Sequence, residues 1–370
     1  MPRVLYQGLL RSPASWARVG RGYVKALLEL GVDVAVVSAR GFGFAPNFTV
    51  PPAPELTPDE ARREGAPIGV GFLHPPLLDR LIGEFRANLF VCESERVPKA
   101  WVEGFARKLD LVLAPSRFTL EALVRSGLPL EQVACVPYGH GLTPAVLAPE
   151  AERRQNRPFT FLAVVNPHHR KGVRELLRAY AAAFTRRDDV RLRVKTTYDP
   201  AGSRRRQPFE MGPWSEVLAE SGLGEPGAPR CDVEIGTLSD DEVAALYGTV
   251  DVCVQPSWGE SFGLAILDAL AAGRPALVTG WGGHMDFVPP GPDVLPYILK
   301  EAGDSLYEPC DGASAAIVDI DALGSRMRWH YENPDASRRG GFEAQRAVTH
   351  LTWANAARQL LETLDAKAGK

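Results

Sequence analysis

The chain has 370 residues, of which 45% are hydrophobic and 24% are charged, and its formal net charge at pH 7 is −3. These values are typical of a globular protein with two domains and give no electrostatic reason to expect nucleic acid as a partner. The five cysteines are an odd number without C-x-x-C spacing, so neither a disulfide framework nor a zinc site is expected. Reduced cysteines favour a cytoplasmic location.

Two kinds of targeting segment are not expected from the sequence. The first ten residues are too short for a signal peptide and already resemble a strand. No apolar run approaches the roughly 20 residues that a membrane-spanning helix needs. A peripheral contact with the inner face of a membrane stays open, because Lys99, Arg107 and Lys108 lie on one predicted helix and could touch lipid phosphates.

The beginning of the chain predicts a βαβ unit and therefore a parallel sheet. Residues 3–6 and 32–38 are apolar runs of strand length, and residues 17–30 between them have helical periodicity. No G-x-G-x-x-G sequence follows the first strand, which argues against a nicotinamide cofactor. Residues 41–66 are rich in proline and lack periodic apolar positions, so they are predicted to form an irregular loop.

Several candidate site residues follow predicted strands in the first half of the chain. Ser15 and Trp16 follow the first strand, and His74 and Glu93 come directly after the apolar runs 68–73 and 89–92. Ligands of doubly wound sheets bind outside the carboxyl ends of the strands. A charged residue in that position favours a site over the core, whereas an ordinary loop position remains the alternative for His74.

The second half of the chain is predicted to form a second domain. Residues 147–158 are polar and flanked by proline, which is typical of a linker. The linker separates a first domain, 1–150 with the helix 353–370, from a second domain, 158–350. Within the second domain, residues 198–230 are predicted to be a solvated insertion, and contact with an anionic acceptor is the alternative.

A cationic loop opens the predicted second domain. Residues 159–165 are predicted to be a strand and 173–184 a helix, and the loop between them ends with Arg170 and Lys171. Adjacent cations after a strand, at the start of a helix, suit a diphosphate. A solvated turn is the alternative. Near the C-terminus, residues 311–329 and 335–364 are predicted to be helices.

The segment 250–288 combines a strand, a polar loop, a helix, a second strand and a glycine-rich loop. The first N–H groups of the helix would be open donors for an anion, and Gly263 allows a ligand close to the main chain. Glu260 and Asp268 could each accept two hydrogen bonds from a vicinal diol. The alternatives are a charge partner of the helix N-terminus for Glu260 and a solvated helix position for Asp268.

Residues 256–275, PSWGESFGLAILDALAAGRP, resemble the signature of retaining GT-B glycosyltransferases of the family-4 type, which has two glutamates with seven residues between them. Asp268 stands in place of the second glutamate, and Ser261 in place of a glycine. The loop NPHHRKG resembles the phosphate loop of this family, with Asn166 in place of the usual arginine.

The resemblance implies an α/β fold of two Rossmann-like, doubly wound domains that face a cleft, with the C-terminal helix crossing back to the first domain. It implies transfer of a hexose-type sugar from a nucleoside-diphosphate donor to a hydroxyl acceptor, with retention of the anomeric configuration. No metal cofactor is expected, because Arg170 and Lys171 face the phosphates. The acceptor stays open among a polysaccharide, a glycolipid and a small glycoside.

The resemblance also implies roles for individual residues. Glu260 would hold donor hydroxyls, Asp268 the ribose and Leu238 the base, while Glu93 and His74 would line the acceptor side. The donor-binding residues would be Asn166, Arg170, Lys171, Leu238, Glu260, Ser261, Phe262, Gly263, Leu264 and Asp268, the acceptor-side residues Ser15, Trp16, His74 and Glu93, and the catalytic residues Glu260, Glu93, His74, Lys171 and Arg170.

Two alternative functions stay open. Several signature positions are altered, so a GT-B protein that binds a nucleotide or sugar without catalysis is one alternative. An NAD-dependent oxidoreductase is the other, and the missing glycine fingerprint disfavours it.

Overall fold

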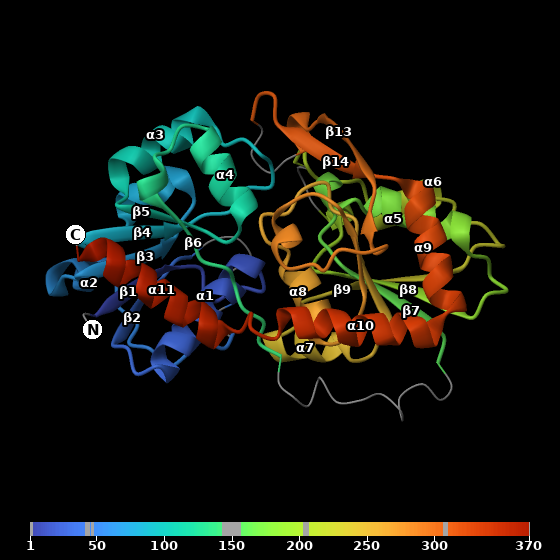
Figure 1. Ribbon diagram of the computed structural model, residues 1–370, viewed down its shortest axis with the longest axis horizontal. Helices are drawn as coiled ribbons and strands as arrows, with labels where there is room; N and C mark the ends of the chain where they lie inside the picture. The colour runs from blue at the N-terminus through green and yellow to red at the C-terminus, as the bar shows by residue number, and fades with distance from the viewer. Residues whose placement is uncertain are drawn as a thin grey trace. The chain divides into compact units, whose positions relative to one another are not determined.

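A computed structural model describes residues 3–40, 45, 48–142, 157–202, 207–305 and 310–369. The chain divides into two compact units, Met1–Gly141 with His350–Lys370 and Leu142–Thr349 (Figure 1). Most of the predicted linker, residues 147–156, lies outside the described part of the chain.

The first unit is built on a six-stranded parallel sheet with the order β2-β1-β3-β4-β5-β6. Its strands are β1 Val4–Gly8, β2 Val34–Ser38, β3 Ile68–Phe72, β4 Phe85–Leu89, β5 Leu111–Ala114 and β6 Val133–Cys135; its helices are α1 Ser15–Glu29, α2 Pro58–Glu64, α3 Lys99–Lys108, α4 Arg117–Arg125 and α11 Trp353–Ala368, with 3-10 turns η1 Pro75–Arg80 and η2 Leu130–Gln132. The chain moves from β1 to β2 on one side and continues at β3 on the other. The loops after β1 and β3 therefore diverge and form a topological switch point, where ligands of such sheets bind.

The last helix, α11, packs against α1 of the first unit (Figure 1). Its Trp353 ring lies so close to α1 that a Cβ on Gly22 would be 2.4 Å from it, and the ring is 5.5 Å from that of Tyr23. The main-chain N–H of His140 donates to the carbonyl of Leu351 at 2.8 Å. The predicted return of the C-terminal helix to the first domain is confirmed.

The second unit repeats this architecture with the sheet order β12-β11-β10-β7-β8-β9, again parallel throughout. Its strands are β7 Phe159–Val164, β8 Val190–Thr196, β9 Arg230–Ile235, β10 Val252–Gln255, β11 Ala276–Thr279 and β12 Val294–Leu295; its helices are α5 Val173–Ala183, α6 Trp214–Glu220, α7 Asp240–Tyr247, α8 Leu264–Ala271, α9 Ile320–Glu332 and α10 Pro334–Val348, and its 3-10 turns are η3 His169–Lys171, η4 Pro200–Gly202, η5 Gly283–Asp286 and η6 Gly303–Ser305. In chain order the sheet runs 3-2-1-4-5-6, so its switch point lies between β7 and β10. The two Rossmann-like units confirm the predicted fold class.

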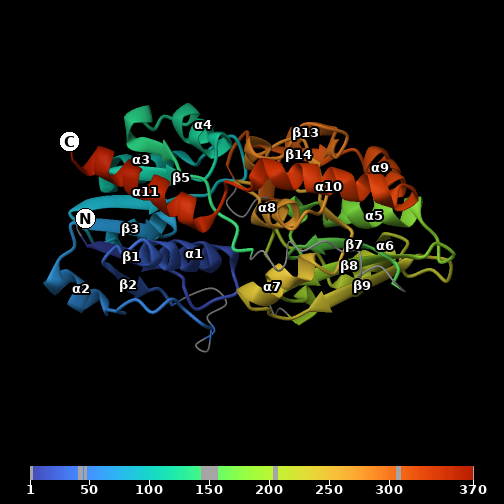
Figure 2. The same ribbon diagram turned by 60° about the horizontal axis from the view of Figure 1, so that its bottom comes forward.

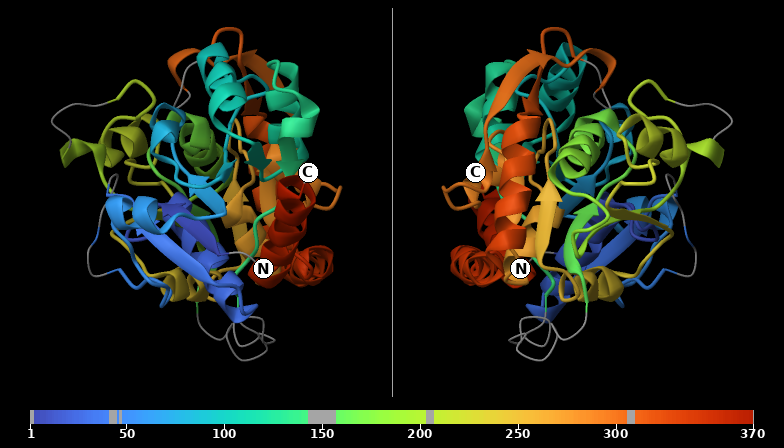
Figure 3. Two further views of the ribbon diagram at one scale, coloured as in Figure 1. Left: turned by 90° about the vertical axis from the view of Figure 1, so that its left-hand side faces the viewer. Right: turned by 90° about the vertical axis from the view of Figure 1, so that its right-hand side faces the viewer.

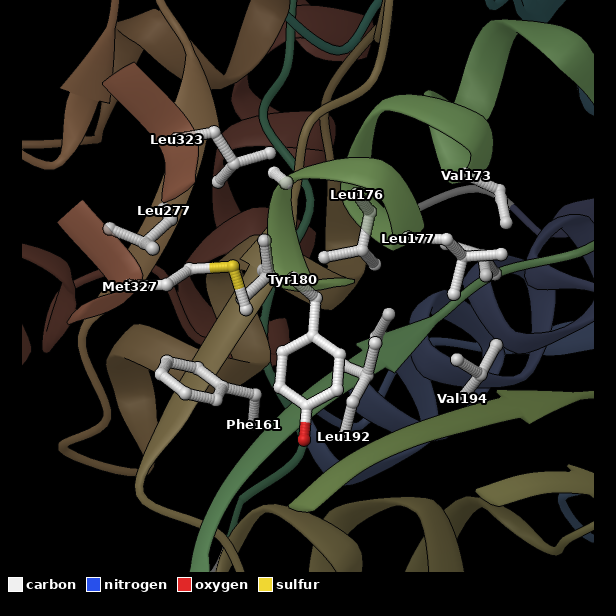
Figure 4. Close-up of a cluster of buried hydrophobic side chains, with 14 of the residues drawn as sticks. Phe161, Val173, Leu176, Leu177, Tyr180, Leu192, Val194, Leu277, Leu323 and Met327 are labelled. Carbon is white, nitrogen blue, oxygen red and sulfur yellow. The ribbon is translucent and has the colours of Figure 1, made fainter. Parts of the chain in front are cut away.

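The core of the second unit lies between the sheet and the helices that cover it. Phe161, Tyr180, Leu192, Leu323 and Met327 meet in one buried cluster (Figure 4). They come from strands and from α5 and α9, which lie side by side (Figure 3), and α10 packs against α8 (Figure 2). Strands buried on both faces are apolar throughout, which is why these runs are readable in the sequence.

Five predicted elements need correction, one of which is the single helix expected at 335–364: the structure divides it into α10, Pro334–Val348, and α11, Trp353–Ala368. The predicted loop 41–66 contains α2, which begins with a capping box between Thr57 and Glu60. The predicted insertion 198–230 contains α6, whose Trp214 is buried.

The other corrections concern boundaries and type. The strand expected at 89–92 is β4, Phe85–Leu89. The first part of the helix expected at 311–329 is the strand β14, Ser314–Val318, which forms an antiparallel hairpin with β13, Tyr297–Glu301, before α9 begins. None of the helices that the structure describes has the length and apolar character to cross a membrane.

Candidate active site

Two loops meet at the switch point of the second unit, one after β7 and one after β10. The chain at Gly172 has φ +62°, and a Cβ there would lie 2.0 Å from the carbonyl oxygen of Pro256. The main-chain N–H of Trp258 donates to the carbonyl of Arg170 at 2.7 Å. Only glycine allows this approach, so the two loops form one surface at the carboxyl edge of the sheet.

This surface carries a cluster of charges. Lys171 Nζ donates to Glu260 Oε1 at 2.5 Å, and Ser257 Oγ donates to the same oxygen at 2.8 Å. Arg170 Nη1 lies 3.8 Å from Oε1 and donates to the carbonyl of Gly259 at 3.2 Å. The exposed side-chain fractions are 12% for Arg170 and Glu260 and 19% for Lys171, so the charges interact through little water.

These neighbours keep Glu260 ionised. Burial by itself raises the pKa of its carboxyl, but the positive charges of Lys171 and Arg170 and the hydrogen bonds from Lys171 and Ser257 outweigh burial and lower the pKa to about 2. At neutral pH the side chain is therefore an acceptor of hydrogen bonds and not a proton donor. This excludes a role as general acid and suits a role in holding hydroxyl groups.

The low pKa of Glu260 predicts a pH dependence of stability. A carboxyl whose pKa falls on folding, here from 4.5 to about 2, stabilises the folded state above pH 4.5, and this contribution is lost as the pH falls toward 2. We expect the melting temperature of the wild type to fall more steeply over this window than that of Glu260→Gln. If the melting temperatures of the two proteins change with pH in parallel between pH 7 and 2, the low pKa assigned to Glu260 is wrong.

Two helices begin at this surface. The N-cap residues of α5 and α8 are Gly172 and Gly263, and both adopt left-handed conformations, with φ of +62° and +92°. The first N–H groups of a helix have no acceptor within it and attract anions. From the β11 side, the N–H of Gly283 donates to the carbonyl of Glu260 at 2.7 Å, which fixes the loop in front of α8.

Gly172→Ala tests whether the contact between the two loops matters. The left-handed conformation alone costs a residue with a Cβ about 1–2 kcal/mol, and the overlap with the Pro256 carbonyl adds to this cost. We expect a lower free energy of unfolding in urea and weaker nucleotide binding. Gly227→Ala is the matched control, because a Cβ there meets nothing within 4 Å. Equal stability of the two variants would show that the loops tolerate separation.

The other predicted donor-side residues occupy different environments. Asn166 Oδ1 accepts a hydrogen bond from Thr197 Oγ1 at 2.8 Å. Ser261 and Phe262 are buried as whole residues. Leu238 is half-buried in the turn after β9, and Leu264 is half-buried as the first residue of α8. The side chain of Asp268 is fully buried, and its ribose contact stays a prediction.

Two of the predicted acceptor-side residues meet at the switch point of the first unit. The ring of Trp16 stacks on those of Phe72 and His74, with centroid distances of 5.1 and 6.4 Å, and His74 lies 5.1 Å from Trp101. Ser15 is exposed as the first residue of α1. Glu93 is half-buried in the loop after β4.

Comparison with known proteins identifies the family. The model of the family described as "Family 4 Glycosyltransferase in conflict systems" matches residues 120–360, which is more than half of the chain. The chain belongs to this family. The match covers the whole charged surface around Glu260.

Curated relatives of this family-4 glycosyltransferase are longer than the chain. The MMP alpha-(1->4)-mannosyltransferase of Mycolicibacterium hassiacum is 27% identical over 254 residues, which are 68% of this chain and 52% of the relative. A D-inositol 3-phosphate glycosyltransferase of Corynebacterium urealyticum is 30% identical over 200 residues, 52% of this chain and 39% of the relative. The chain thus spans about half of these relatives or less.

Solved structures share the fold over the whole chain. Sucrose-phosphate synthase from Thermosynechococcus elongatus has a TM-score of 0.69 at 18% identity, with 99% of both chains covered. HepE from Anabaena has a TM-score of 0.69 at 15% identity, with 99% of this chain and 100% of HepE covered. Both are glycosyltransferase folds of the GT-B type, and at this identity the likeness shows the fold alone.

Some residues of the site were not among the predicted ones. Ser257 bonds to Glu260, and Gly172 and Gly282 allow the main chain to approach closely; a Cβ on Gly282 would lie 3.0 Å from the carbonyl oxygen of Glu260. The sequence could have indicated these residues only through their position beside the candidate residues at the ends of strands. Among the residues that the structure describes, no group of three or more His, Cys, Asp or Glu side chains is arranged to hold a metal ion.

Proposed function

We propose that the chain transfers a hexose-type sugar from a nucleoside-diphosphate donor to a hydroxyl acceptor, with retention of the anomeric configuration. The observation that carries the proposal is the charge cluster of Arg170, Lys171 and Glu260 at the switch point between β7 and β10, beside the N-termini of α5 and α8. The mannosyltransferase relative and the complexes of HepE with UDP and with UDP-glucose support this choice of ligand.

The positive groups would hold the diphosphate. Lys171 and Arg170 share one carboxylate oxygen of Glu260, and a diphosphate offers them more negative charge than this single group. Cations and helix amides that already point to one place stabilise the charge that develops on a leaving group without reorganising. A divalent metal is then unnecessary for binding or for departure of the diphosphate.

Glu260 would hold the sugar. Its contacts with Lys171, Ser257 and Arg170 in the described chain all go to Oε1, so Oε2 is the oxygen that can accept from a donor hydroxyl. Because the carboxyl stays ionised, these hydrogen bonds are of the charge-assisted kind, which are about twice as strong as neutral ones. The sugar is thereby placed against the phosphate group that leaves.

The proposed reaction needs no covalent enzyme intermediate. The bond between the anomeric carbon and the diphosphate oxygen breaks, and the acceptor oxygen bonds to the anomeric carbon on the same face. The acceptor proton passes to the leaving phosphate oxygen. At the first unit, the cluster of Trp16, Phe72 and His74 lies at the switch point where the acceptor would bind.

A panel of nucleotide sugars tests the function. The chain is incubated with UDP-, GDP- and ADP-sugars and hydroxyl acceptors in the presence of a chelator, and products are followed by NMR of the anomeric proton. We expect transfer from one donor class, without added metal and with retention. An inverted product would reject retention, and strict dependence on a divalent ion would reject the metal-free site.

The non-catalytic alternative is separated by the same preparation. Nucleotide binding without release of sugar from any donor, to acceptor or to water, would favour a binding protein. Transfer by the wild type would reject this alternative.

A further inference from the structure

Lys195 is a buried lysine outside the charge cluster, in β8. Only 8% of the residue is exposed. Its Nζ donates to three main-chain carbonyls, of Thr196 at 3.1 Å, of Glu234 at 3.2 Å and of Gly236 at 2.5 Å. An ammonium group has three N–H donors, so all of them are used on the main chain.

The three carbonyls lie where β8 and β9 end. Lys195 pairs with Glu234 in the sheet, and the N–H of Gly236 donates to the carbonyl of Thr196 at 3.0 Å. Gly236 has φ +144°, and the nearest atom to a Cβ there would be Lys195 Nζ at 4.0 Å. The ammonium group therefore fixes the turn 236–238, in which the chain leaves the sheet.

If the Lys195 side chain served packing alone, burial of its charge would cost free energy without a compensating gain. A buried charge must be compensated by hydrogen bonds, and replacing buried ionic groups by apolar side chains of similar volume is often neutral or stabilising. Lys195 instead joins the end of β8, through Thr196, to β9 and to the first residue of the turn, through Glu234 and Gly236, and so restricts the conformation of that turn. We therefore infer that the conformation of residues 236–238 matters for function.

The turn 236–238 lies beside the surface formed by Arg170, Lys171 and Glu260, on the side away from β11. The sheet continues from β7 to β8 and then to β9, all parallel, so the turn after β9 is on the same carboxyl edge as Lys171. On the opposite side, the loop after β11 holds Glu260 through Gly283, and His284 is fully buried. The part of a nucleotide beyond its diphosphate would thus extend over β8 and β9.

The turn offers contacts that suit a flat heterocycle. Ile235 is 53% exposed at the end of β9, and Leu238 is half-exposed. Within the described chain, the main-chain N–H groups of Thr237 and Leu238 have no acceptor. An apolar surface with a few fixed main-chain groups is typical of a site that binds a ring and reads its edge.

We propose that Lys195 is a positioning residue for the nucleobase of the donor, because it fixes the turn 236–238 that contacts the base. The inference rests on the proposed function, since it takes a nucleotide as the ligand of this edge. It goes beyond that function in naming what sets the choice of base. Lys195 itself does not touch the nucleotide.

The test compares base selectivity. Dissociation constants of UDP, GDP and ADP are measured by calorimetry for the wild type and for Lys195→Met, which keeps the length of the side chain and removes its donors. We expect the ratio between the weakest and the tightest diphosphate to fall about tenfold in the variant, and KM for the donor to rise with kcat unchanged. A general loosening of the unit weakens all three diphosphates equally, so an unchanged ratio would overturn the proposal.

Two further variants keep the test decisive if Lys195→Met does not fold. Gly236→Ala strains the turn without a steric overlap and should lower the same ratio if Lys195→Met does not fold. Lys300→Met changes an exposed lysine of β13 and should leave the ratio at the wild-type value. If the wild type binds the three diphosphates equally, the role proposed for Lys195 is wrong. If it binds none of them, the proposed function is wrong as well.

Discussion

Glu260→Gln is expected to lower kcat by about 10- to 150-fold, because a hydrogen bond to a charged group contributes about 1.5–3 kcal/mol and each 1.36 kcal/mol is tenfold in rate. The amide keeps the shape of the side chain and loses the charge that holds the donor hydroxyl. Binding of the bare nucleoside diphosphate should persist or tighten, since Lys171 no longer shares its charge with a carboxylate. Calorimetry and single-turnover kinetics measure the two effects separately.

The control for this variant is Glu216→Gln, which neutralises an exposed carboxylate on α6 of the same unit. It should leave both kcat and nucleotide affinity within twofold, roughly the effect of a surface charge. Wild-type turnover in Glu260→Gln would remove Glu260 from the reaction. Loss of nucleotide binding together with turnover would indicate that the charge maintains the shape of the loop and does not hold the sugar.

Lys171→Met is expected to weaken binding of nucleoside diphosphates by about 10- to 150-fold, the equivalent of one charge-assisted hydrogen bond. The matching nucleoside, which lacks phosphate, should bind as it does to the wild type. Thermal shifts with UDP and uridine, or with the pair for the preferred base, measure this difference. Equal loss for the nucleoside and the diphosphate would contradict a phosphate contact.

The same variant also exposes the balance within the cluster. Without Lys171, Glu260 keeps Arg170 at 3.8 Å and the hydrogen bond from Ser257, and removing one partner of a buried pair costs up to about 3–5 kcal/mol. The double variant Lys171→Met/Glu260→Gln should recover part of this stability and should not recover diphosphate affinity. Lys300→Met, on the exposed strand β13, is the control for loss of a lysine.

The fold was predictable where burial imposes a pattern. The strands β7, β10 and β11 are apolar on both faces, and Gly273 closes the helix between β10 and β11, so the order of elements from 250 to 288 follows from the residues. The missed elements lack such a pattern. The helix α2 is short and mostly exposed, and the hairpin of β13 and β14 has an exposed strand of five residues.

The site was predictable only in part. Residues at the carboxyl ends of parallel strands share one edge of a sheet, which is why Lys171 and Glu260 could be expected near one another. Their hydrogen bond depends on the contact between Gly172 and Pro256, which arises from two loops separated by some eighty residues. In β8, Lys195 continues the alternation of Arg191 and Arg193 with apolar residues. Nothing in the local sequence therefore distinguishes it from a solvated position.

The most direct test of the account is a crystal structure of the chain with the nucleoside diphosphate, among UDP, GDP and ADP, that raises its melting temperature most. We predict the diphosphate within hydrogen-bonding distance of Lys171 Nζ, the Arg170 guanidinium and the first N–H groups of α8. A diphosphate bound elsewhere, with Lys171 still paired to Glu260 and both helix N-termini open to solvent, would contradict it.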